Sequence, residues 1–134
     1  MIKIGIIGTG GMGNHHASQF TKMKGVKVVA CCDISELRCK TFAKKWKVPK
    51  VYVDYHKMLE KEKLDGVANV TPDVMHAPIS IAVIEKGIPI LCEKPMATNY
   101  NEAKQMLEAA TKYKVVNMVN FSYRSSSGLQ AAAK

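Results

Sequence analysis

Short apolar runs alternate with amphipathic stretches along the whole chain. Runs rich in β-branched residues predict strands, whereas apolar residues spaced three and four positions apart predict helices. The predicted strands are residues 2–7, 26–32, 51–53, 65–70, 89–92 and 115–121, and the predicted helices are residues 12–23, 35–46, 55–62, 77–86 and 99–113. Because the strands are apolar on both faces, helices are expected to cover the sheet on each side. The pattern therefore predicts an α/β fold: a doubly wound parallel sheet of about six strands in three αβα layers.

Capping residues support several of these boundaries. Ser35 stands where a helix begins, and Asn99 and Glu102 have the spacing of a capping box. Gly25 and Gly87 are well placed to end the helices that precede them.

A glycine-rich segment joins the first predicted strand to the first predicted helix. In the motif Gly8-x-Gly10-x-x-Gly13, the first glycine permits a tight turn, the second lets a pyrophosphate approach the backbone, and the third lets the helix lie close to the sheet. The free N–H groups and the dipole at the start of that helix favour phosphate. A turn without a ligand is the alternative, but the strand–turn–helix context favours a dinucleotide. The predicted cofactor contacts in this segment are Gly8, Thr9, Gly10, Gly11, Met12 and Gly13.

Asp33 ends the second predicted strand, about 20 residues beyond the glycine motif, where a carboxylate binds an adenosine ribose. A carboxylate repels a 2′-phosphate, so the cofactor is predicted to be NAD rather than NADP. Arg38 and Lys40 lie close by in the sequence and keep NADP as an alternative. Asp33 can also cap the following helix, which is compatible with ribose binding. Ile34 and Arg38 are further candidate contacts of the adenosine.

The chain of 134 residues is the size of one domain, and its formal net charge is +9. Eight lysines lie between positions 40 and 63. They could form an anion-binding or nucleic-acid-binding face, or the solvated surfaces of two helices. Because the chain has only two arginines, we prefer the second interpretation and expect no nucleic-acid partner.

Four cysteines lack the C-x-x-C spacing of a metal site, and three of them lie in or beside apolar runs. We expect reduced core thiols, no metal site and a cytoplasmic protein. No apolar run approaches the ~20 residues of a membrane helix, and the N-terminus does not have the pattern of a signal peptide. We therefore expect no membrane partner.

Five motifs together resemble one family: "GIIGTGGMGNHHA", Asp33, "NVTPDVMHAP", "CEKPMA" and "NFSYR", in that order. Over essentially the whole chain, they resemble the N-terminal domain of the Gfo/Idh/MocA oxidoreductases, the glucose-fructose oxidoreductase and inositol dehydrogenase group. The resemblance implies an NAD(P)-binding Rossmann domain over residues 1–122. It also implies that residues 123–134 begin the connection to a C-terminal α/β domain, absent from this chain, that supplies most of the substrate pocket and the contacts of a homo-oligomer. Members of the family act on sugars, inositols and related small alcohols or carbonyls.

The resemblance places Asn69, Thr71 and Pro72 beside the cofactor, although Thr71-Pro72 could simply end the strand. His76 matches a family histidine at the start of the next helix and is a candidate contact of the cofactor. A structural hydrogen-bonding role is the preferred interpretation of this histidine. His15 and His16 are also interpreted as structural, because adjacent helix residues point to different faces.

The segment Glu93-Lys94-Pro95 follows a buried strand, and charges at such a strand end suggest a ligand site. The resemblance implies that Lys94 is catalytic and hydrogen-bonds the reacting oxygen or the ribose. Glu93 is expected to hold the lysine or to contact the ribose, and the Lys94–Pro95 bond is expected to be cis. An ion pair that merely caps a turn is the alternative.

The second domain of the family commonly carries a D-x-x-x-H motif whose histidine is the general acid/base, and this chain has none. We therefore expect a domain that binds NAD but gives little turnover alone. Tyr123 and Arg124 match the family's crossing into that second domain, where Arg124 could meet substrate or brace the two domains. A non-catalytic dinucleotide sensor and an inactive fragment are the alternatives to an enzyme.

Overall fold

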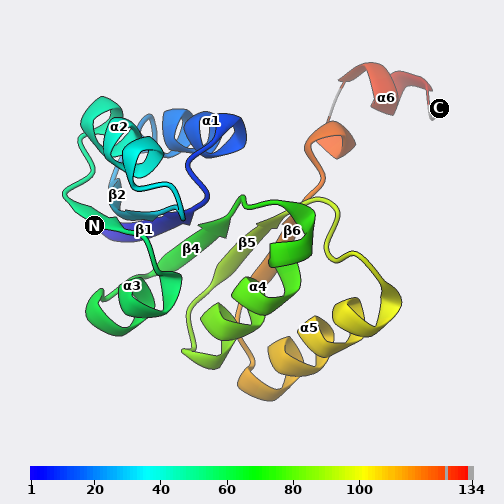
Figure 1. Ribbon diagram of the computed structural model, residues 1–134. Coiled ribbons are helices and arrows are strands. Elements are labelled where there is room, and N and C mark those ends of the chain that lie inside the picture. The colour runs from blue at the N-terminus through cyan, green and yellow to red at the C-terminus, as the bar shows by residue number, and fades with distance from the viewer. Residues whose placement is uncertain (126, 133–134) are drawn as a thin grey trace.

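The computed structural model describes residues 1–125 and 127–132 and contains one parallel sheet of six strands (Figure 1). The strands run in the order β3-β2-β1-β4-β5-β6. Their bounds are β1 Ile2–Ile7, β2 Val26–Cys32, β3 Lys50–Tyr52, β4 Gly66–Asn69, β5 Ile90–Glu93 and β6 Asn117–Asn120. The α-helices are α1 Gly11–Phe20, α2 Glu36–Trp46, α3 Tyr55–Lys61, α4 His76–Glu85, α5 Tyr100–Tyr113 and α6 Ser127–Ala132, and short 3-10 turns are η1 Asp73–Met75 and η2 Ser122–Ser125. The predicted doubly wound fold is therefore confirmed.

Successive residues of each central strand enter different hydrophobic cores. Ile6 of β1 packs with Cys31 and Ala68 and with residues of α1 and α2, whereas Ile7 packs with residues of α3 and α4 on the opposite face. The two layers of helices lie on either side of the sheet in Figure 1. Burial on both faces explains why the strands read as continuous apolar runs.

The N-caps of two helices agree with the sequence. The Ser35 hydroxyl accepts a hydrogen bond from the Arg38 N–H, and the Asn99 side chain accepts one from the Glu102 N–H. The second half of the predicted capping box differs, because the Glu102 carboxylate accepts from the N–H and the hydroxyl of Thr98 rather than from Asn99.

Several predicted ends were wrong. Helix α1 ends at Phe20, three residues before Met23, which is about half exposed in the turn that follows. Gly25 therefore serves that turn, with φ +81°, rather than the helix end. The sixth strand begins at Asn117 instead of residue 115. In the segment 123–134, which was expected to begin the connection to a second domain, the structure has η2 and α6, and residues 126, 133 and 134 lie outside the described residues.

Two helices end in a way that the sequence did not indicate. Lys47 after α2 and Lys114 after α5 adopt the left-handed conformation, with φ 56° and 51°. Glycine usually occupies this position at a helix end because it has no Cβ.

The described helices include none with both the length and the apolar character that crossing a membrane requires.

Candidate dinucleotide and nicotinamide site

The carboxyl ends of β1 and β4 lie side by side, and the chain leaves them toward opposite faces of the sheet. Helix α1 follows β1 on one face and α4 follows β4 on the other (Figure 1). Ligands of open α/β sheets bind in the crevice at such a switch point.

The glycine turn at this point leaves room for a pyrophosphate. Gly8 has φ +98°, and a Cβ there would lie 2.6 Å from the Val70 carbonyl oxygen. A Cβ on Gly13 would lie 2.2 Å from the Gly8 oxygen, so the third glycine lets α1 approach the turn. A Cβ on Gly10 or Gly11, by contrast, would have no atom of the described residues within 4 Å. The residues therefore fit a dinucleotide: two glycines close the turn, and the two between them keep the helix N-terminus open.

Asp33 lies beside this turn and is only 8% exposed. Its Oδ2 accepts hydrogen bonds from the N–H and the hydroxyl of Thr9, both at 2.9 Å, and its Oδ1 accepts one from the Ser35 N–H at 2.9 Å. Burial alone would raise the pKa of Asp33, but hydrogen bonds from Arg38, Thr9 and Ser35 outweigh it and lower the pKa to about 2. The carboxylate is thus fixed and ionised. Thr9 is itself buried and holds Asp33.

Arg38 occupies the carboxylate that was expected to receive the ribose. Its Nε lies 3.0 Å from Oδ2 and its Nη2 lies 2.8 Å from Oδ1 of Asp33. The Arg38 side chain is half exposed, so this bidentate pair is accessible to solvent. A ribose that binds Asp33 must share the carboxylate with the guanidinium or displace it. Ile34 is 92% exposed at the same edge.

Asn69 and His76 form a polar network under the turn that follows β4. The Asn69 amide donates to the His76 carbonyl oxygen and to Ser80, both at 3.1 Å, and its oxygen accepts from the Thr71 hydroxyl at 2.7 Å. The His76 ring bridges the carbonyl oxygens of Thr71 and Pro95, at 2.8 and 2.6 Å. Both side chains are buried, which agrees with a structural role for His76. Pro72, between them in the sequence, is exposed.

Glu93 has partners that the sequence did not suggest. Its Oε1 accepts from His16 Nε2 at 2.7 Å and from the Asn120 amide at 2.6 Å, and its Oε2 accepts from the Lys94 backbone N–H at 3.2 Å. Burial would raise the pKa of Glu93, but these hydrogen bonds outweigh it and hold the pKa below its ordinary value.

Of the two roles expected for Glu93, holding the Lys94 side chain is not observed, and the alternative of a turn-capping ion pair is absent as well: among the described residues, Glu93 pairs with His16 and the Lys94 ammonium pairs with no carboxylate. Contact between Glu93 and the ribose stays a prediction. The expected cis bond between Lys94 and Pro95 is present.

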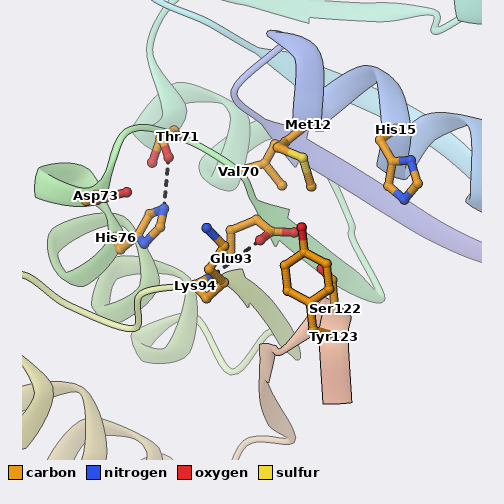
Figure 2. A pocket seen from close by; sticks show the side chains of 10 residues that line it. All are labelled: Met12, His15, Val70, Thr71, Asp73, His76, Glu93, Lys94, Ser122 and Tyr123. Atoms are coloured by element: carbon orange, nitrogen blue, oxygen red, sulfur yellow. Dashed lines mark hydrogen bonds between the residues drawn. The ribbon is translucent and has the colours of Figure 1, made fainter. Parts of the chain in front are cut away.

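A cavity of about 500 Å³ lies over the ends of β4 and β5 (Figure 2). Figure 2 shows Glu93 and Lys94 between the other lining residues, with residues of α1 on one side and the Thr71 turn on the other. Its lining consists of Met12, His15, Val70, Thr71, Asp73, His76, Glu93, Lys94, Ser122 and Tyr123. His15, which the sequence interpretation treated as structural, thus contributes to a ligand-sized space. Arg124 instead lines a neighbouring hollow beside β6.

Asn120, which donates a hydrogen bond to Glu93, was not among the predicted site residues. Asn120 stands opposite Glu93 in the register of β5 and β6. A polar residue at the end of a predicted strand was the available signal.

Over residues 1–125 and 127–132, no three histidine, cysteine or acidic side chains come together as a metal site would require.

The sheet order, the glycine turn and Asp33 define a dinucleotide-binding Rossmann domain. The model of the Gfo/Idh/MocA oxidoreductase family, NAD-binding Rossmann fold, matches residues 2–121, and the chain belongs to this family. It is 31% identical to an inositol 2-dehydrogenase of Rubrobacter xylanophilus over 109 aligned residues. The aligned region covers 81% of this chain and 31% of that relative.

Solved structures agree with this assignment. A myo-inositol 2-dehydrogenase of Lactobacillus plantarum has a TM-score of 0.91 at 26% identity. The superposed region covers 98% of this chain and 39% of the dehydrogenase chain. The WlbA dehydrogenase of Chromobacterium violaceum, in complex with NADH and UDP-GlcNAcA, has a TM-score of 0.92 at 27% identity. The superposed region covers 97% of this chain and 38% of the WlbA chain. The chain thus spans 31% to 39% of the length of these relatives, and it is the NAD-binding Rossmann domain of this family.

Proposed function

We propose that this chain is the cofactor-binding part of an NAD-dependent oxidoreductase that acts on a CH–OH or carbonyl group of a sugar, inositol or related polyol. Similarity to inositol dehydrogenases supports the substrate class. The observation that carries the proposal is the position of Lys94, whose side chain lines the cavity over β4 and β5 without a carboxylate partner among the described residues.

The binding roles follow from the geometry of the turn. The open N-terminus of α1 at Gly10 and Gly11 would hold the pyrophosphate, and Asp33 would accept the ribose hydroxyls. We propose that NAD binds more tightly than NADP, because a buried carboxylate repels a 2′-phosphate. Tighter NADPH than NADH binding in a calorimetric titration would contradict this preference.

Lys94 is proposed as the catalytic residue of the domain. The bound nicotinamide supplies the chemistry of hydride transfer. The Lys94 ammonium would donate a hydrogen bond to the substrate oxygen that gains or loses negative charge, which stabilises the transition state more than the ground state. His76 and the Thr71 turn would hold the Lys94–Pro95 backbone in place through the Pro95 carbonyl.

Two measurements test the proposal. The 134-residue chain should bind NADH in a calorimetric titration and should form no NADH steadily from NAD⁺ over a panel of polyols. In a full-length protein that carries this domain, Lys94→Ala should leave the dissociation constant of NADH within about threefold and lower kcat by about 100-fold or more. Unchanged turnover in that variant would remove Lys94 from the reaction.

A dinucleotide sensor without catalysis is the competing proposal, since the glycine turn and Asp33 are sufficient to bind a dinucleotide. A sensor requires the glycine turn and Asp33 but not a free lysine in the cavity. Full turnover by the longer protein, lost on Lys94→Ala, would decide for the enzyme. We also keep the cytoplasm as its proposed location, because the four cysteines are buried free thiols.

A further inference from the structure

A buried carboxylate forms part of the cavity wall at the end of β5. Glu93 is 5% exposed and is held from three elements: His16 of α1, Asn120 of β6 and the Lys94 N–H. Three donors on one carboxylate favour its charged form. Its pKa lies below the ordinary value for the same reason. The cavity therefore contains a fixed negative charge that solvent screens poorly.

The position of this charge relative to the dinucleotide follows from the fold. Asp33, at the end of β2, marks the adenosine end, and Gly10 marks the pyrophosphate above β1. The sheet order continues from β1 to β4 and β5, so the other half of the dinucleotide extends toward the cavity over those strands. Glu93 and Lys94 lie in that half, together with Met12 and Thr71 (Figure 2).

The two oxidation states of the cofactor differ in charge at this end of the molecule. The nicotinamide ring of NAD⁺ carries a positive charge, and the ring of NADH is neutral. We propose that Glu93 determines selectivity between the two states: its carboxylate makes this site bind NAD⁺ more tightly, relative to NADH, than the same site would without the charge. This inference rests on the proposed cofactor-binding function.

Other charged or titratable groups face the same cavity, namely His15, Asp73, His76, Lys94 and Tyr123, and His16 contacts Glu93 directly. Lys94 opposes Glu93 in sign, but Lys94 and Asp73 are both exposed, so water screens their fields more strongly. A proton on the His16 imidazole would offset the charge of Glu93, and the test is therefore made at pH 8.

The test measures the dissociation constants of NAD⁺ and NADH for the 134-residue chain by calorimetry and takes their ratio, Kd(NADH)/Kd(NAD⁺). Glu93→Gln should lower the ratio about tenfold, the effect of a unit charge about 10 Å away at an effective dielectric constant of about 20. Glu93→Asp keeps the charge and should leave the ratio within about threefold of the wild-type value. Asp73→Asn, an exposed carboxylate of the same cavity, should change it less than twofold.

Lys94→Met provides a test of opposite sign and keeps the proposal testable if Glu93→Gln does not fold. Removal of this cation should raise the ratio about threefold; an unchanged or lower ratio would contradict the electrostatic account. Thermal unfolding of each variant shows whether it folds.

If Glu93→Gln weakens NAD⁺ and NADH by a common factor, Glu93 only supports the turn and the inference is overturned. If the wild-type chain binds neither form, the proposed function fails as well, and the two failures are thereby distinguished.

Discussion

Alanine substitutions in the glycine turn should separate folding from cofactor binding. A Cβ on Gly13 would lie 2.2 Å from the Gly8 carbonyl oxygen, an atom of the rigid turn backbone. Relief of this contact to an ordinary van der Waals distance requires α1 and the turn to separate by roughly 1.2 Å or more in a closely packed region, and overpacking of this kind costs about 1–3 kcal/mol. We expect Gly13→Ala to lower the free energy of unfolding by about 2–3 kcal/mol and also to weaken NADH binding.

Two neighbouring glycines provide matched controls. A Cβ on Gly10 or Gly11 would meet no atom of the described residues within 4 Å. Gly11 lies in the first turn of α1, where alanine has the higher helix propensity, so Gly11→Ala should stabilise the fold by up to about 1 kcal/mol. Gly10→Ala should leave stability within about 0.5 kcal/mol but weaken NADH binding about tenfold or more, because its methyl group occupies the space for the pyrophosphate.

The assays are urea unfolding followed by circular dichroism, and calorimetric titration with NADH. The outcome that refutes the reasoning is a Gly10→Ala variant that binds NADH as the wild type does, because the open space above Gly10 would then not be the phosphate site. A Gly13→Ala variant with unchanged stability would show that the close approach of α1 to the turn is not needed.

Two further predictions concern stability. Because the pKa of Asp33 in the folded state is about 2, below its ordinary 3.8, Asp33 contributes stability that is complete above about pH 4 and is lost as the pH falls toward 2. The loss should be about 2 kcal/mol, and Asp33→Asn should flatten it in urea unfolding between pH 5 and 2; an equal acid dependence in both proteins would contradict the assignment. Lys47→Gly and Lys114→Gly should each raise the free energy of unfolding by about 0.5–1 kcal/mol, because glycine adopts the left-handed conformation without strain; a lower melting temperature in both would contradict this.

Local signals in the sequence were sufficient for the elements and for half of the site. Apolar runs of the right length located all six strands. The spacing of Gly8, Gly10 and Gly13 predicted the turn, because the positive φ of Gly8 and the approach of Gly13 to Gly8 involve only residues close in the sequence. Errors fell at element ends. Apolar spacing continued to Met23, but α1 ends at Phe20 because side-chain periodicity does not report where backbone hydrogen bonding stops.

The partners of the charged side chains were decided only by the tertiary structure. Glu93 lies next to Lys94 in the sequence, yet its carboxylate bonds His16, which is 77 residues away, and Asn120, which is 27 residues away. These contacts exist because the sheet places β5 beside β6 and brings α1 over the same edge, and no local pattern contains that arrangement. The bidentate hydrogen bonds from Arg38 to Asp33 were missed for a related reason. The sequence spacing allows this pair, but only the turn between β2 and α2 brings the guanidinium to the carboxylate. Sequence periodicity thus determined which residues reach the edge of the sheet, and the packing of distant strands determined which charges meet there.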